Sequence, residues 1–405
     1  MIVEIEADAK ASLDLEVNLS RAFRCTEEIT EDGLLKISGT LDSGAEKPGM
    51  GYAAYAQILT EGKNAVIEEG RVYDADKAWI IISAATSYFE GDDYDRKARE
   101  ILAKATENFD PERTYAASVQ AHKALYDRAS VHLESDAASA SLPAGERIIA
   151  YSEGAKDNHL AALYYNYGRY LLICSTREGS LPPNLQGLWA NTYQTPWNGD
   201  YHTNINVQMN HWIAEQGNLS ELHLPLTDLV LNMIPSGQKT AKDFYGDQAQ
   251  GWVQHMMTNV WNYTAPGEHP SWGATNTGGA WLCDHLWEHF AYTGDMEYLA
   301  RVYPALKGAS QFFLSTMIRE PKNGYLVTAP SSSPENTFYE DSKAVSICMG
   351  PTMDTQLVRE LFQQTCAAAS MLADSSEKSF CDSLERALQQ LAPHQISEEG
   401  YLMEW

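Results

Sequence analysis

Glu335 is the residue whose type and setting best suit acid catalysis. It lies in the loop APSSSPENTFYED, residues 329–341, which is rich in serine and proline. A carboxylic acid can protonate the oxygen of a leaving sugar when its surroundings raise its pKa. An isolated loop glutamate is more often a solvated surface charge, and this alternative stays open. The neighbouring Glu340, Asp341 and Asp354 are interpreted mainly as surface charge.

Amide and aromatic side chains are concentrated upstream of this loop, around DYHTNINVQMNHW, residues 200–212. His202, Asn204 and Asn206 follow a segment that contains Trp189 and other aromatic residues. Amides can hydrogen-bond the hydroxyl groups of a sugar, and an aromatic face can pack on its apolar ring face. The pattern therefore favours a carbohydrate site. The alternative is that the two asparagines cap a helix, as asparagine commonly does.

Four tryptophans occur within a short stretch: Trp252, Trp261, Trp272 and Trp281. Some of them are expected to pack in a core. Glycine and threonine residues between them make a purely structural role less convincing, and we include Trp272 and Trp281 among the candidate sugar-binding residues.

We predict no metal ion or cofactor. His285 and His289 are spaced i, i+4 on a helix, which a metal ion could use, but the motif lacks the HExxH arrangement. Two helical histidines more often pack or cap. The chain also has no GxSxG elbow, no phosphate-binding P-loop and no dinucleotide glycine fingerprint.

Helical periodicity dominates from Asp157 onward. The apolar stripe of the first helix runs from Leu160 to Cys174. Six more helices are expected at 204–216, 221–240, 279–292, 296–318, 353–373 and 377–391. Long connections (175–203, 241–278, 319–352) alternate with short ones (217–220, 293–295, 373–377). Short connections join antiparallel neighbours, so the three long loops should lie at one end and form the active face.

The first ~90 residues are expected to be strands, because short apolar runs recur between turn residues. These runs are 34–41, 51–59, 64–73 and 78–86. They favour part of an antiparallel β-sandwich over residues 1–90. A helical stripe from His122 to Ala129 predicts a helical linker over 91–150, followed by the helical domain over 151–405.

Composition excludes several classes of partner. The chain has 405 residues, with 29 basic and 55 acidic side chains and a net charge of −26. Nucleic acid and anionic membrane surfaces would be repelled, and no apolar stretch is long enough to span a bilayer. The six cysteines lack CxxC spacing. They favour the cytoplasm; a secreted or periplasmic location is the alternative if a signal peptide precedes this sequence.

Several blocks of the sequence resemble glycoside hydrolase family 95, the 1,2-α-L-fucosidases and related α-L-galactosidases. The most distinctive runs from NLQGLW (184–189) to DYHTNINVQMNHW (200–212). GGAWLCDHLWEHFAYTGD (278–295) and SPEN (333–336) are similar to further family blocks in the same order, and SVQAHKALYDRASVHL (118–133) is similar to the family's linker helix.

The resemblance implies a β-sandwich, a helical linker and an (α/α)6 barrel that hydrolyses glycosides with inversion and needs no metal or cofactor. Glu335 would be the general acid, and Asn204 and Asn206 would position the attacking water. His202 would bind the sugar, and Trp281 would form part of the pocket wall. The family's catalytic base belongs to a motif similar to DGNFG, which does not occur here. We therefore expect a fragment that lacks both ends, with an incomplete barrel and little activity alone.

The sequence thus predicts an inverting glycoside hydrolase that releases terminal α-1,2-linked L-fucose from a fucosylated oligosaccharide or glycan. One alternative is an α-L-galactosidase, another glycosidase or a phosphorylase on the same barrel. A second alternative, from another class, is a non-catalytic carbohydrate-binding protein. Oligomeric state cannot be inferred from these patterns.

Overall fold

The computed structural model describes residues 1–44, 46–134 and 141–405. The chain divides into two compact units, Met1–Val119 and Gln120–Trp405. Each unit is described separately below. The domain boundaries expected at residues 90 and 150 stay predictions.

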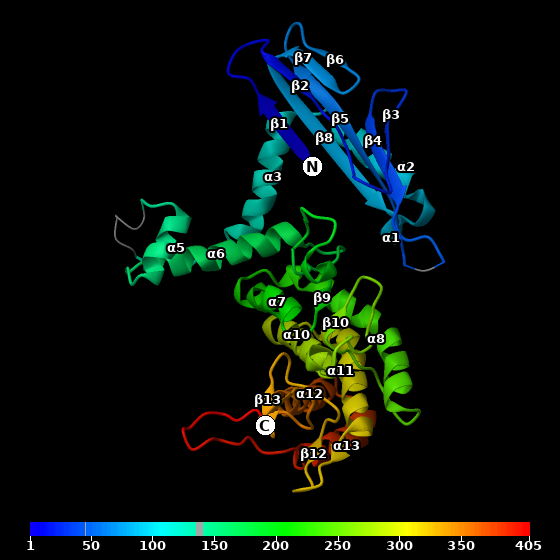
Figure 1. The fold of residues 1–405 in the computed structure, drawn as a ribbon, viewed down its shortest axis with the longest axis vertical. Helices are drawn as coiled ribbons and strands as arrows, with labels where there is room; N and C mark the ends of the chain where they lie inside the picture. The colour runs from blue at the N-terminus through cyan, green and yellow to red at the C-terminus, as the bar shows by residue number, and fades with distance from the viewer. Residues whose placement is uncertain (45, 135–140) are drawn as a thin grey trace. The chain divides into compact units, whose positions relative to one another are not determined.

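The first unit is built on two antiparallel sheets, with strand orders β1-β8-β5-β4-β3 and β2-β7-β6 (Figure 1). The strands are β1 Ile2–Glu6, β2 Leu13–Glu16, β3 Thr26–Ile29, β4 Leu35–Thr40, β5 Gly51–Glu61, β6 Val66–Glu68, β7 Arg71–Ala75 and β8 Lys77–Thr86. The prediction of an antiparallel, strand-rich N-terminal region is confirmed.

Side-chain alternation gives the larger sheet two apolar faces. Ala56 and Ile58 of β5 pack in one core with Val72 of β7, so the two sheets share a hydrophobic layer. Tyr55, on the opposite face of β5, packs in a second core with helix α2 (Tyr94–Thr106). Burial on both faces explains why β5 and β8 are rich in apolar residues.

The second unit is mainly helical, as predicted. Its longer helices are α6 Asn158–Ser175, α7 Asn206–Gln216, α8 Leu224–Tyr245, α10 Gly278–Thr293, α11 Met296–Thr316, α12 Thr352–Met371 and α13 Lys378–Leu388. Helix α3 (Pro111–Tyr126) runs into this unit from the first, and α5 (Ala144–Ser152) precedes α6. Among the residues that the structure describes, no helix combines the length and apolarity needed to cross a membrane.

The main core of the second unit lies between α8, α10, α11 and α12. Trp252 is 1% exposed and its indole Nε1 donates to the carbonyl oxygen of Ala305, 2.9 Å away. Gly308 makes room for it, because a Cβ atom there would lie 2.7 Å from the indole. This tryptophan therefore anchors the second long loop in the core, which agrees with the packing role expected for part of the tryptophan group.

Arg169 joins three segments at the start of the second unit. It is fully buried on α6, and its guanidinium donates to the backbone carbonyls of Leu125, Tyr126 and Ala129 near the end of α3. A further bond reaches the carbonyl of Gly217 after α7, at 3.0 Å. The planar fork of an arginine suits several acceptors at once, whereas a lysine offers a single ammonium group.

We therefore expect Arg169→Lys to lower the free energy of unfolding of the helical unit by about 2–4 kcal/mol, because buried carbonyl groups lose their donors. Chemical denaturation followed by circular dichroism at the helical band measures this change. Arg177→Lys is the matched control, since Arg177 is exposed and should change stability by less than about 0.5 kcal/mol. Equal effects of the two substitutions would contradict the role given to Arg169.

Candidate active site

A short antiparallel pair holds the first and second long loops together. Strand β9 (Tyr201–His202) pairs with β10 (Met257–Thr258), and His202 lies opposite Met257. Thr203, the next residue, donates its backbone N–H to Met256 and its hydroxyl to the carbonyl of His255, both at 2.6 Å. These bonds fix the backbone between His202 and Asn204.

The start of helix α10 packs directly against this pair. A Cβ atom at residue 278 would lie 2.2 Å from the carbonyl oxygen of His255 and 3.0 Å from Oγ1 of Thr203. Only glycine permits so close an approach. Trp281 follows in the first turn of α10 and is half-buried. Gly278 therefore brings the helix that carries Trp281 onto the segment that carries His202 and Asn204.

Asn204 does not cap helix α7. The N-cap position is Ile205, and no side chain caps this helix. The amide of Asn204 is 7% exposed, and its Oδ1 has no hydrogen-bond partner among the described residues. Asn206 is the first residue of α7 and is half-buried. A buried amide oxygen without a donor costs about 1–3 kcal/mol, and such a group calls for a reason other than stability.

Two further amides in this region were missed by the sequence analysis. Gln254 donates to the backbone carbonyl of Met257 at 2.6 Å, while its Oε1 has no partner among the described residues. Asn276, two residues before α10, likewise has a buried Oδ1 without a partner. The sequence feature that could have identified them is an amide among tryptophans, glycines and threonines in a long loop, as in WVQHMM and ATNTGGAW.

The negative charge of Glu335 acts electrostatically on His202. Burial lowers the pKa of His202, and the nearby charges of Asp200, Glu335 and Glu268 oppose this shift. Glu335 itself is exposed, at a turn closed by the backbone bond from Asn336 N–H to the carbonyl of Ser333 (2.7 Å). Residues from all three long loops therefore act on one imidazole, which agrees with the expectation that these loops gather at one end.

Asp354 is the exception among the three carboxyl groups near Glu335, most of which are expected to be surface charge. It is fully buried at the start of α12 and accepts bonds from Thr277 Oγ1 at 3.2 Å and Thr328 Oγ1 at 2.6 Å. Burial raises its pKa to about 6, although the hydroxyl groups around it act in the opposite direction. Thr277 belongs to the second long loop (241–278) and Thr328 to the third (319–352), which also contains Glu335. This carboxyl group therefore ties the second loop to the third. Glu340 and Asp341 are exposed, as predicted.

The two candidate tryptophans differ in their surroundings. Trp272 belongs to the short helix α9 (Pro270–Gly273), and its indole stacks on the imidazole of His269, with ring centroids 4.6 Å apart and planes at 25°. Trp281 lies on α10, beside the backbone contact at Gly278. Trp281 thus belongs to the helix whose start packs on Thr203 and His255, whereas Trp272 lies on the loop segment that also carries Glu268.

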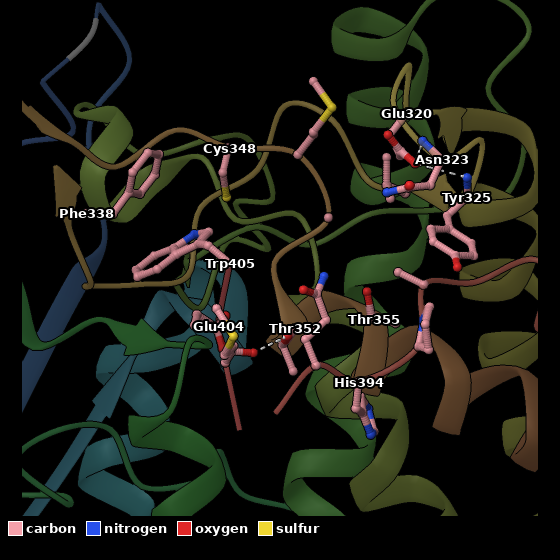
Figure 2. Close-up of a pocket in the computed structure, with 17 residues that line it drawn as sticks. Glu320, Asn323, Tyr325, Phe338, Cys348, Thr352, Thr355, His394, Glu404 and Trp405 are labelled. Atoms are coloured by element: carbon pink, nitrogen blue, oxygen red, sulfur yellow. Dashed lines mark hydrogen bonds between the residues drawn. The ribbon is translucent and has the colours of Figure 1, made fainter. Parts of the chain in front are cut away.

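A separate cavity of about 320 Å³ lies beside the third loop (Figure 2). Its lining includes Phe338, Cys348, Glu404 and Trp405, and the rings of Phe338 and Trp405 are 5.0 Å apart. None of the six candidate residues lines it. Cys348 exchanges two backbone hydrogen bonds with Ser331, at 2.9 and 3.0 Å. These bonds join Cys348, which lines the cavity, to the loop that carries Glu335.

The chain is similar to known proteins over most of its length. The model of the glycosyl hydrolase family 95 catalytic domain matches residues 110–405. Alpha-L-fucosidase 2 of Arabidopsis thaliana is 33% identical over 375 residues, which cover 88% of this chain and 44% of that protein. The protein named "Probable alpha-fucosidase A" in Aspergillus niger is 32% identical over 381 residues, which cover 88% of this chain and 47% of that protein. The chain thus spans less than half the length of these curated relatives.

A solved structure described as "Putative kojibiose phosphorylase from human microbiome" has a similar fold. The TM-score is 0.62 at 11% sequence identity, and the match covers 97% of this chain and 50% of that one. At this level of identity the comparison concerns the fold alone.

The buried carboxyl group of Asp354 predicts a pH dependence of stability. Its pKa is about 6 in the folded chain against an ordinary value of 3.8. Between these values the folded state holds a proton that the unfolded state has lost. The free energy of unfolding therefore falls as pH rises from about 4 to about 6, by about 3 kcal/mol from this group.

Asp354→Asn should lack this fall, because an amide does not titrate in this range. Urea denaturation of both proteins at a series of pH values measures the difference between the two curves. Asp341→Asn is the control, since Asp341 is exposed in the same region, and it should leave the curve unchanged. Parallel curves for the parent and Asp354→Asn would show that Asp354 does not have the raised pKa.

Proposed function

Because the chain belongs to glycosyl hydrolase family 95, we propose that the protein hydrolyses terminal α-1,2-linked L-fucose from glycans with inversion of configuration. The observation that carries this proposal is the electrostatic interaction of an exposed carboxyl group, Glu335, with His202, in a region where buried amide oxygens have no donor among the described residues. A fucose residue would supply hydroxyl donors for such oxygens and a glycosidic oxygen for the acid. The relatives named as alpha-fucosidases support the choice of sugar.

We assign the roles as follows. Glu335 protonates the departing glycosidic oxygen as the general acid, and its exposure leaves it open to a glycan. Asn204 and Asn206 position the attacking water. The Oδ1 of Asn204, which has no partner among the described residues, can accept a hydrogen bond from this water. Inversion requires room for this water between the acid and the group that activates it, which are typically about 6.5–9.5 Å apart.

His202, Trp281 and Trp272 bind the sugar in this proposal. The buried imidazole of His202 is held by the β9–β10 pair, so it can offer a fixed polar contact. Trp281 offers an aromatic face at the start of α10, where a sugar ring can stack. The helices from α6 onward belong to an (α/α)6 barrel, and the fold shared with the kojibiose phosphorylase structure supports this assignment.

We expect Glu335→Gln to lower the rate of fucose release from 2′-fucosyllactose at least about 100-fold, because glutamine cannot donate the proton. Binding of the trisaccharide, followed by saturation-transfer NMR, should be retained. Glu340→Gln is the control, since Glu340 is an exposed glutamate of the same loop. The rate of fucose release is measured for this 405-residue chain and for the protein as its gene encodes it. The sequence predicts slow turnover by the 405-residue chain alone.

Each alternative has its own outcome in this assay. Unchanged release by Glu335→Gln would remove this residue as the acid. Product formation that requires phosphate would indicate a phosphorylase, and a preference for L-galactosides a galactosidase. Binding without release by the protein as its gene encodes it would indicate a carbohydrate-binding protein. NMR of the first product tests inversion, because an α-linked fucose must appear first as the β-anomer.

A further inference from the structure

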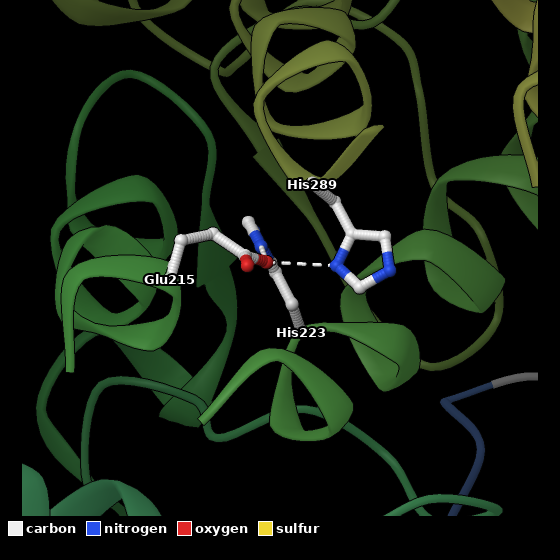
Figure 3. Close-up of side chains that lie close together, drawn as sticks. All are labelled: Glu215, His223 and His289. Atoms are coloured by element: carbon white, nitrogen blue, oxygen red, sulfur yellow. Dashed lines mark hydrogen bonds and ion pairs between the residues drawn. The ribbon is translucent and has the colours of Figure 1, made fainter. Parts of the chain in front are cut away.

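Three polar side chains from separate segments meet in the interior of the second unit (Figure 3). Glu215 comes from the end of α7, His223 lies at the start of α8, and His289 comes from the last turns of α10. They are 5%, 1% and 6% exposed, respectively. Two imidazoles and one carboxylate are a typical ligand set for zinc in proteins.

We propose that Glu215, His223 and His289 form a binding site for a divalent transition metal ion, most simply Zn²⁺. One potential ligand atom from each residue lies within 4.8 Å of the others. Oε1 of Glu215 is 2.8 Å from Nδ1 of His223 and 2.7 Å from Nδ1 of His289. Ligand atoms around a tetrahedral zinc ion are about 3.3 Å apart, so the two contacts of Glu215 would have to open by about half an ångström to admit the ion.

The surrounding groups are arranged as metal ligands require. Metal-bound histidines usually donate their second ring N–H to a further acceptor, which fixes the tautomer. Nε2 of His223 is 2.9 Å from Nδ1 of His285, so His223 bound through Nδ1 can donate to His285. The hydroxyl of Ser220 donates to Oε2 of Glu215 at 2.5 Å and orients the carboxylate.

The same contacts exclude a metal site in which His285 and His289 both bind one ion. Although their i, i+4 spacing could present both to one ion, His285 instead contacts His223, while His289 contacts Glu215. His285 therefore supports a ligand and is not one itself.

The ion would have a structural role. His289 is eight residues beyond Trp281 on α10, which is about 12 Å along the helix axis. The site therefore lies at the opposite end of α10 from the candidate active site. An ion there would cross-link α7, α8 and α10 at the end where short connections join the helices, independently of the proposed hydrolase activity.

Metal binding by the purified 405-residue chain tests this proposal. After removal of metal with a chelator, titration with Zn²⁺ should show about one tight equivalent and raise the melting temperature, because the ion binds only the folded state. Co²⁺ serves as a spectroscopic probe, and X-ray absorption of the Zn²⁺ form should show nitrogen and oxygen ligands at about 2.0–2.2 Å.

Variants locate the ion. Glu215→Gln and His289→Gln should each weaken binding at least about 100-fold, and His285→Asn about 10–100-fold through loss of the supporting hydrogen bond. His255→Asn is the control. His255 is also a buried histidine, but it lies outside the cluster and contacts Tyr245 and Thr264. This variant should bind one equivalent of Zn²⁺, like the parent.

The absence of saturable Zn²⁺ binding by the parent chain would overturn the proposal. Unchanged binding by Glu215→Gln and His289→Gln would do so as well. Should these variants fail to fold, X-ray absorption of the parent decides: two imidazole ligands support the site, and sulfur ligands would place the ion at cysteines instead.

Discussion

The buried carboxyl group of Asp354 ties two of the long loops to the start of α12. Moving a carboxylate out of water is costly unless hydrogen bonds replace its hydration. Here the donors are the hydroxyls of Thr277 and Thr328, which belong to two different long loops. Both loops must therefore come together at the start of α12 for the fold to form. Their meeting places Trp281 and Glu335 at the same end of the helices.

Buried side chains also fix the other parts of the long loops. Trp252 anchors the second loop in the core through Ala305. Tyr201 holds the first loop by donating its hydroxyl to the carbonyl of Pro182 at 2.9 Å. Long loops without secondary structure are usually mobile, so such anchors are needed if a loop is to hold side chains in a fixed geometry.

Periodicity was enough to predict most of the helical region. The helix expected at 296–318 is α11, Met296–Thr316, and that expected at 279–292 is α10, Gly278–Thr293. The helix expected at 221–240 is α8, which begins later, at Leu224, because residues 221 and 222 belong to the separate turn Ser220–Leu222. The expected end of α8 at residue 240 is also early, because the polar residues that follow continue the helix to Tyr245.

The candidate site was predicted less completely, because burial depends on contacts between distant segments. Asp354 has the local sequence of a surface residue at a helix start, and only Thr277 and Thr328 make it a buried group. Gln254 and Asn276 stand among tryptophans, glycines and threonines, but this composition does not show that their oxygens are buried and have no donor among the described residues. His202, Asn204 and Glu335 could be selected, since aromatic and amide residues cluster near them and the loops alternate in length.

Polar groups are satisfied differently at the two ends of α7 and α10. At one end, Glu215 accepts bonds from His223, His289 and Ser220, so each partner in this buried network lowers the cost of burying the others. At the other end, the oxygens of Asn204, Gln254 and Asn276 have no donor among the described residues. A hydroxylated ligand would remove this second cost on binding. In the proposed function, the attacking water or a sugar hydroxyl would supply the donor that Asn204 lacks, whereas the network around Glu215 is complete within the chain.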